Sequence, residues 1–478
     1  MECNQVNTPL LDKAIHHIRK SPFSLHVPGH KNGQIFAQKG YEFFEKVMKL
    51  DLTEIPGLDD LHAPDGVIKE AQSIAADWFQ TDATFFLVNG STVGNLAMIL
   101  ATCDADDLVL VQRNCHKSVL NGLELAGARP VFLAPQFNHE TTRYEHPSIE
   151  VIEKACKSNP DAKALILTYP DYFGKTFDLK KIIEIAHQYN IPVLIDEAHG
   201  CHFSVPYFKN KSAVDLGADI VIQSAHKMTP ALTMGAYLHI PDNTRINKQK
   251  VTHYLQILQS SSPSYLIMIS LDIARHYLAN YTLEMYEQLS SYIREVRYIF
   301  RSNDWWQLET VDDPLKIVIK TMPYVSSNQI FTYFEKENII AELKTDQDIL
   351  FIFGMEPTIE IKDLRFAVEK VKANLQKYSK SAEKHAKIEN NHHHIIYRTE
   401  KLAYSYQHMK MLKTKWVELD DSIGLIASEA IIPYPPGIPL IAKGEEVTAE
   451  HVELIKQLRN RDITFHPSGD IKGLNVFD

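Results

Sequence analysis

Two neighbouring apolar runs in the middle of the chain each lead into a polar residue. Residues 193–195 are Val-Leu-Ile and run directly into Asp196, and residues 219–223 read DIVIQ and are soon followed by Lys227. Short, β-branched apolar runs of this kind are typical of buried parallel strands. A parallel sheet gathers the carboxyl ends of its strands at one edge, so Asp196 and Lys227 are expected to lie close together.

An acid and a lysine at adjacent strand ends suit a site for pyridoxal phosphate (PLP). The Lys227 amine can bond covalently to the PLP aldehyde, and the Asp196 carboxylate can pair with the pyridinium nitrogen. That pairing keeps the nitrogen protonated, so the ring can accept electrons from a substrate carbon. Taken alone, the two residues are equally compatible with a helix cap and a solvated lysine.

The surrounding sequence alternates between strand and helix patterns. Strands are predicted at 83–88, 107–111, 130–134, 164–168 and 234–240, and helices at 67–79, 93–101, 147–157 and 178–189. This alternation predicts an α/β fold with a mostly parallel sheet covered on both faces. Several polar residues directly follow the predicted strands, which favours a ligand site there: Asn89, His116, Asp171, Asp196 and Lys227.

A Gly-Ser-Thr turn, residues 90–92, joins the strand at 83–88 to the next helix. The free backbone N–H groups, the helix dipole and the hydroxyls of Ser91 and Thr92 would together form an anion site. An ordinary Ser/Thr cap is the alternative interpretation.

Composition restricts the class of protein. The 478 residues carry a net charge of −10, which argues against general affinity for nucleic acid. The five cysteines are scattered and include no CxxC pair, as expected of reduced cytoplasmic thiols. No apolar run reaches membrane-spanning length, so neither a membrane partner nor a location outside the cytoplasm is expected. No zinc-type spacing occurs, and no metal is expected.

Changes in pattern along the chain suggest five segments. They are an N-terminal segment (1–65), a PLP-binding large domain (66–300), a small α/β domain (301–376), a charged linker (377–395) and a C-terminal α+β domain (396–478). One long helical stretch, about 266–302, is expected to lead out of the large domain. The acid-rich loop 51–66 is either a solvated loop or an acidic wall that attracts a cationic substrate.

Eight motifs along the chain resemble those of the bacterial Orn/Lys/Arg decarboxylase family. They are PGHK (28–31), GLDDLH (57–62), TFFLVNGST (84–92), RNCHKSV (113–119), DEAHG (196–200), SAHK (224–227), SPSY (262–265) and PYPPGIPL (433–440). The resemblance implies the PLP-dependent transferase fold, type I. It also implies decarboxylation of arginine, lysine or ornithine to the corresponding polyamine-pathway amine and CO₂.

The same resemblance implies roles for individual residues around PLP. Lys227 would bond to the aldehyde, Asp196 would pair with the ring nitrogen, and His116 would stack on the ring. His199 stands where some long relatives carry Trp. The remaining candidates would surround the phosphate: Ser91, Thr92, Ser224 and His226.

Substrate and subunit contacts follow from similar reasoning. The candidate carboxylates for a cationic substrate are Asp59, Asp60 and Glu445. In the family a hydroxyl near SPSY reaches the phosphate of the partner subunit, here from Ser261 or Ser262. SPSY lies just before the long helical stretch, so its hydroxyls are expected to be poorly placed for the phosphate site at Ser91 of their own chain. PGHK begins at residue 28, so the N-terminal wing domain that builds decamers in long relatives is expected to be missing. A homodimer or a dimer of dimers with shared sites is expected.

Two other functions compete with decarboxylation. An aminotransferase of the same fold would anchor the substrate carboxylate with an arginine of the small domain, for which Arg365 is a candidate. A catalytically silent PLP-binding protein is the second competitor. The presence of Lys227, Asp196 and His116 together argues against it.

Overall fold

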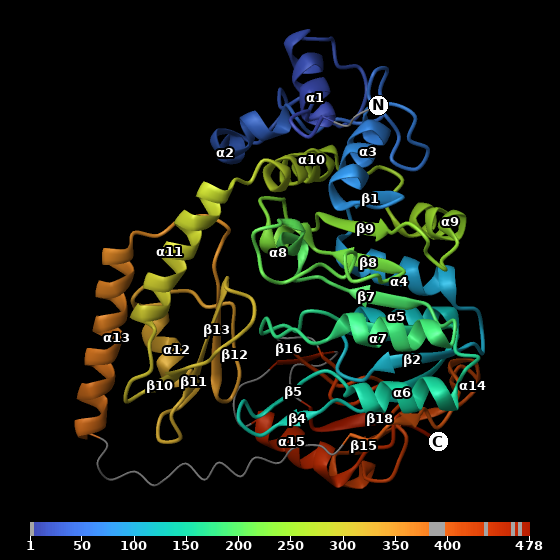
Figure 1. Ribbon diagram of the computed structural model, residues 1–478, viewed down its shortest axis with the longest axis vertical. Coiled ribbons are helices and arrows are strands. Elements are labelled where there is room, and N and C mark those ends of the chain that lie inside the picture. The colour runs from blue at the N-terminus through green and yellow to red at the C-terminus, as the bar shows by residue number, and fades with distance from the viewer. Residues whose placement is uncertain (1–3, 382–396, 435–437, 460–463, 467–470) are drawn as a thin grey trace.

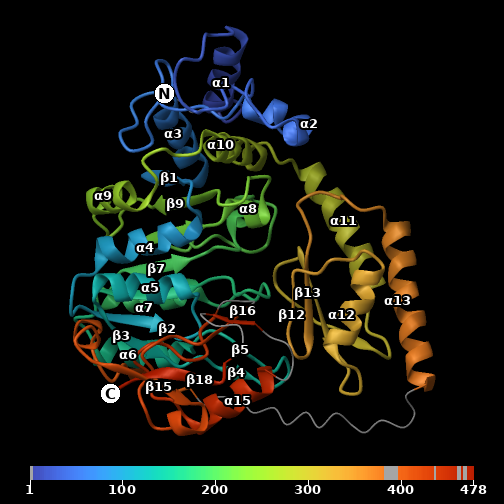
Figure 2. The same ribbon diagram turned by 180° about the vertical axis from the view of Figure 1, so that it is seen from behind.

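The computed structural model describes residues 4–381, 397–434, 438–459, 464–466 and 471–478 (Figure 1). Most of the predicted linker therefore lies outside the described residues, as do Pro435, Pro436 and Gly437 of the proline-rich motif. A large domain, a small domain beside it and a C-terminal region beneath the large domain can be followed in Figures 1 and 2.

An eight-stranded sheet in the order β1-β9-β8-β7-β6-β2-β3-β14 forms the centre of the large domain. The strands are β1 (Ala83–Leu87), β2 (Leu108–Gln112), β3 (Arg129–Leu133), β6 (Ala164–Thr168), β7 (Val193–Asp196), β8 (Ile220–Gln223), β9 (Ala236–Ile240) and β14 (Glu400–Lys401). Only β9 and β14 run against the others. The predicted mostly parallel sheet is confirmed, and six strands, β1 included, end at the same edge.

Alternate residues of each strand face opposite helical layers, which is why the strands read as continuous apolar runs. Ile220 and Ile222 of β8 pack with α4 (Gly90–Thr102), α5 (Lys117–Ala126) and α9 (Lys248–Leu258). Val221 instead faces α6 (Ile149–Ser158) and α7 (Leu179–Gln188). Helix α5 begins within the RNCHKSV motif because His116 caps its first turn.

The N-terminal segment lies over the β1 side of the sheet. Here α1 (Pro9–Arg19), α3 (Val67–Phe79) and α10 (Tyr265–Ala279) share one apolar core. The intervening α2 (Gln38–Met48) buries none of its residues. The expected single helix at 266–302 is instead two helices, α10 and α11 (Leu283–Ile299), because the Thr282 hydroxyl accepts the Met285 N–H and starts a new helix.

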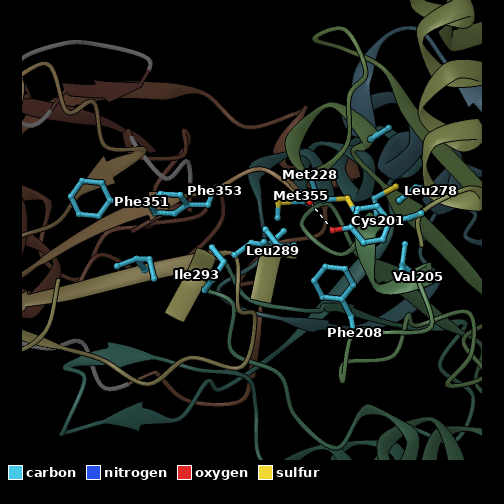
Figure 3. Close-up of a cluster of buried hydrophobic side chains, with 14 of the residues drawn as sticks. Cys201, Val205, Phe208, Met228, Leu278, Leu289, Ile293, Phe351, Phe353 and Met355 are labelled. Carbon is cyan, nitrogen blue, oxygen red and sulfur yellow. Dashed lines mark hydrogen bonds between the residues drawn. The ribbon is translucent and has the colours of Figure 1, made fainter. Parts of the chain in front are cut away.

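The small domain is a four-stranded antiparallel sheet with helices on one side. Its sheet order is β10 (Trp306–Leu308), β11 (Lys316–Thr321), β13 (Asp348–Ile352) and β12 (Leu343–Lys344), and its helices are α12 (Ser327–Lys336) and α13 (Ile361–Ser381). An apolar cluster joins it to the large domain (Figure 3). Cys201, Val205 and Met228 meet Leu289, Phe353 and Met355 in this cluster.

The C-terminal region has its own core, and it is joined to the large domain by strand pairing and by an ion pair. Its elements are α14 (Tyr406–Met409), β15 (Thr414–Glu418), β16 (Ile432–Tyr434), α15 (Ala449–Arg459), β17 (Thr464–His466) and β18 (Gly473–Phe477). Strand β14 pairs with β3, and the buried Arg113 guanidinium bonds both carboxylate oxygens of Glu445 at 2.5 Å. Over the described part of the chain, no helix is both long and apolar enough to cross a membrane.

Candidate active site

The parallel strands bring the predicted residues together at one edge of the sheet. Asp196 is the last residue of β7, and its neighbour β8 leads through Ser224 into the short helix α8 (Ala225–Met228), which carries Lys227. Strand β1 ends at the same edge and leads into α4. The Ser224 hydroxyl donates to the Ser91 hydroxyl at 2.7 Å, which closes this end of the site.

The Asp196 carboxylate is buried and held by two donors. The Asn95 side-chain amide donates to it at 2.8 Å and the Ala198 N–H at 3.1 Å. Asn95 also donates to the Ser118 hydroxyl at 2.9 Å. Asn95 and Ser118 were not predicted from the sequence, although Ser118 lies inside the RNCHKSV motif. Asn95 holds the Asp196 carboxylate in one orientation, and Ser118 connects Asn95 to His116.

His116 is held as a neutral ring. Its Nδ1 accepts the Ser118 N–H at 3.2 Å and lies 2.8 Å from the Ser118 hydroxyl, so the ring proton belongs on Nε2. Burial lowers the pKa of His116, and the nearby Asp196 charge opposes this effect only in part. A neutral imidazole with one nitrogen fixed in this way is suited to stacking on a flat aromatic ring.

The Lys227 amine lies beside two aromatic rings that contact each other, those of His199 and Tyr172. Its Nζ is 3.2 Å from His199 Nε2 and 6.0 Å from the centre of the Tyr172 ring. The surrounding protein lowers the pKa of Lys227, while the Asp196 and Glu342 carboxylates act in the opposite direction. Its side chain nevertheless remains open to solvent. A depressed pKa and access from outside are what a nucleophilic lysine requires.

A phosphate group fits at the start of α4. Gly90 has a φ of +76°, and a Cβ added there would meet no atom within 4 Å, so open space lies beside this turn. The helix N-terminus, the Ser91 hydroxyl and the exposed Thr92 border it. His226 is fixed nearby by its Nδ1, which lies 3.0 Å from the Gly235 carbonyl oxygen. The residues present therefore match PLP at its phosphate, ring and aldehyde ends.

The turn at Ser261 and Ser262 follows a residue that contacts the end of β1. Both side chains are exposed, but the Ser260 N–H reaches the Asn89 side-chain oxygen of the same chain at 3.4 Å. Asn89 directly precedes the turn at Gly90. The turn therefore lies close to the end of β1 in its own chain, and the use of its hydroxyls by a partner subunit stays a prediction.

Two of the three candidate substrate carboxylates have other partners. Asp59 is buried and accepts N–H groups of the first turn of α3, including those of Gly66 and Ile68 at 2.8 and 3.0 Å. Glu445 is paired with Arg113. Both carboxylates therefore stabilise the fold and are not part of the substrate site. Asp60 is exposed, and its carboxylate accepts the His62 N–H.

Arg365, the candidate anchor for a substrate carboxylate, lies outside this site. Arg365 projects from α13 to Glu295 of α11 at 3.6 Å, on a solvent-exposed face of the small domain. Among the described residues, no three His, Cys, Asp or Glu side chains are grouped so as to hold a metal ion. One carboxylate that the sequence did not suggest does reach the site: Glu342 of the small domain accepts the Tyr172 hydroxyl at 2.6 Å.

The sheet order and this set of side chains define a PLP-dependent enzyme of fold type I. Lysine decarboxylase A from Pseudomonas aeruginosa has the same fold: the superposition gives a TM-score of 0.81 at 20% identity and covers 99% of this chain and 81% of that one. Residues 8–321 match the major domain of Orn/Lys/Arg decarboxylases, and residues 388–466 match their C-terminal domain. The chain belongs to the Orn/Lys/Arg decarboxylase family.

Relatives span nearly the whole chain. The protein called uncharacterized protein YaaO of Bacillus subtilis is 41% identical and covers 98% of this chain and 97% of its own length. The arginine decarboxylase of Bacillus anthracis is 32% identical, with 95% and 93% covered. As a member of this family, the chain is a lyase that uses PLP to decarboxylate a basic amino acid.

Proposed function

We propose that the chain decarboxylates arginine, with Lys227, Asp196 and His116 as its catalytic residues. The observation that carries this proposal is the convergence of Asp196, Lys227 and the Ser91–Ser224 pair on one sheet edge. The choice of arginine is supported by relatives of similar length that are called arginine decarboxylases.

Each residue has a task that its surroundings explain. Bound PLP supplies an electron sink for the pair left at the substrate carbon when CO₂ departs. Ser91 and Ser224 bind the phosphate, and Asp196 holds a proton at the ring nitrogen. His116 covers one ring face. His199, at 3.2 Å from the Lys227 amine, can pass a proton to or from that nitrogen.

The substrate test compares three amino acids. Purified enzyme with PLP is incubated separately with arginine, lysine and ornithine, and CO₂ and the amine product are measured. We expect kcat/KM to be highest for arginine. A preference for lysine or ornithine would overturn the choice of substrate, and transamination without CO₂ release would overturn decarboxylation.

Glu342 is proposed to attract the cationic end of the substrate. It is exposed, and its charge acts on Lys227. Glu342→Gln removes the charge at nearly constant volume, so we expect KM for arginine to rise about tenfold or more. Glu335→Gln, an exposed acid on α12, is the control. An unchanged KM in Glu342→Gln would remove Glu342 from the substrate site.

We propose that two chains form a dimer with shared active sites, alone or as a dimer of dimers. The N-terminal segment exposes large apolar side chains: Phe23 is 97% exposed, Leu25 93% and Phe43 78%. Apolar surface gathered in this way is typical of an interface. The exposed hydroxyls of Ser261 and Ser262 are available to a partner's phosphate site, and an isologous interface would create two such sites.

Subunit mixing tests for shared sites. Lys227→Ala is mixed in equal amounts with a Ser261→Ala, Ser262→Ala double variant under conditions where subunits exchange. In a mixed dimer with shared sites, one site receives both lesions and the other none, so activity should recover towards about a quarter of wild type. If each variant is inactive alone and exchange is proven, absence of recovery would show that each site is built within one chain.

A cytoplasmic location is also proposed. Cys103, Cys115, Cys156 and Cys201 are free and buried, as expected of a chain that folds in a reducing compartment. Cell fractionation with an antibody to the chain tests the location. Recovery in the secreted fraction would contradict it.

A further inference from the structure

The turn that follows β6 is hydrogen-bonded to the small domain. The Gly174 carbonyl oxygen accepts the N–H groups of Asp312 and Asp313 at 3.1 and 3.0 Å. Gly174 has a φ of +86°, and a Cβ there would lie 2.8 Å from Asp313 Cβ and from Lys316 Cδ. The backbone of this turn therefore lies directly against the Lys316 side chain, at a distance that only glycine permits.

Lys316 is a completely buried lysine at the start of β11. Its Nζ donates to the Tyr172 carbonyl oxygen at 2.8 Å and lies 3.5 Å from that of Asp171. Burial lowers its pKa to about 8, although the charges of Asp313 and Asp171 act against this. Lysine is rarely buried because removing the ammonium group from water is costly. A role in the nearby active site would account for the burial of Lys316.

Both ends of Tyr172 are held by the small domain. Lys316 binds its carbonyl oxygen, and Glu342 accepts its hydroxyl at 2.6 Å. Between these two anchors the ring meets the His199 ring at a centre distance of 4.6 Å, and the Lys227 Nζ lies 6.0 Å from its centre. The position of the small domain thus determines where the Tyr172 ring lies relative to the catalytic lysine.

We propose that Lys316 is a positioning residue that holds Tyr172 beside His199 and Lys227 and adds a positive charge to the surroundings of the Lys227 nitrogen. This inference rests on the proposed role of Lys227 as the lysine that bonds to PLP. A lysine that only joined two domains would leave the protonation of that nitrogen unchanged when it is replaced. The two roles therefore differ in a measurable way.

Charged and titratable groups from every neighbouring element surround the Lys227 nitrogen. Asp196 and Glu342 favour its protonated form. The charge of Lys227 lowers the pKa of Lys316, and this repulsion between two positive charges is mutual. The other groups that face it are His116, His199, His226 and Tyr172.

Removing the Lys316 charge takes away a repulsion, and release of Tyr172 admits water. Both changes raise the pKa of the nitrogen.

The experiment is a spectroscopic pH titration of the PLP-loaded enzyme without substrate. The visible absorption of PLP changes when the nitrogen that joins it to Lys227 loses its proton. In Lys316→Met the midpoint of this change should move upwards by about one pH unit relative to wild type. Lys316→Gln retains a donor for Tyr172 but not the charge, so its shift should be smaller than that of Lys316→Met.

The control is Lys320→Met on the same strand, whose side chain bonds the Glu140 carbonyl oxygen away from Lys227. Its midpoint should equal that of wild type. Circular dichroism establishes that each variant is folded, and Lys316→Gln is decisive if Lys316→Met does not fold. A folded variant with a wild-type midpoint overturns the inference. If instead wild-type enzyme holds its PLP on another lysine, the proposed role of Lys227 has failed.

Discussion

Asp196→Asn should lower kcat/KM for the preferred substrate at least about a hundredfold. The substitution removes the negative charge proposed to hold a proton on the ring nitrogen, and it changes the volume very little. Without that proton the ring is a weaker electron sink, so the barrier to loss of CO₂ rises. Release of CO₂ from carboxyl-labelled substrate measures the effect.

Cofactor binding should survive the same change. Ser91 and Ser224 remain, so PLP released on denaturation should still equal the amount of protein. Asp161→Asn, an exposed acid of the large domain, serves as the matched control and should have wild-type activity. Near-normal turnover by Asp196→Asn, with PLP bound, would contradict the role assigned to the carboxylate.

Lys227→Ala should abolish decarboxylation, with a loss of at least about ten-thousandfold. The lysine is proposed to carry the cofactor and to hold a proton at its Nζ, and His199 cannot replace a primary amine in the first of these tasks. The Lys227 side chain is open to solvent rather than part of the core. The melting temperature should therefore stay close to that of wild type.

Borohydride reduction identifies the lysine directly. Wild-type enzyme treated with borohydride should carry reduced PLP on the peptide that contains Lys227, as read by mass spectrometry. Lys209→Ala, which replaces another exposed lysine of the large domain, should give the same labelled peptide. Label on a different lysine would refute the assignment, and with it the explanation offered for the loss of activity in Lys227→Ala.

Local sequence patterns predicted the strand-end residues of the site. An apolar run that ends in Asp196, and another followed by Lys227, can be read without knowledge of distant contacts. The partners of these residues could not be read in this way. Asn95 reaches Asp196 across 101 residues of sequence, and Lys316 reaches Tyr172 across 144. Such contacts depend on how helices and domains pack.

The missed strand β14 and the two wrong substrate candidates also depend on contacts between segments that are distant in the sequence. Strand β14 is only two residues long and leaves no periodic signal, and its pairing depends on β3 far away in the chain. Asp59, in the acid-rich loop, and Glu445 were candidates for contact with a cationic substrate. Composition does not show that a helix N-terminus and a buried guanidinium already occupy these carboxylates.

The bond between Arg113 and Glu445 joins residues 332 positions apart, and this has a consequence for synthesis on the ribosome. A growing chain folds from its N-terminus. Until residues 400–445 have been made, Arg113 lacks its carboxylate partner, and Val131 and Phe132 of β3 lack the residues that pair with them. The nascent large domain therefore exposes an unpaired strand edge, which invites association with other chains. Synthesis of residues 400–445 supplies both the carboxylate for Arg113 and the backbone partners for part of that edge.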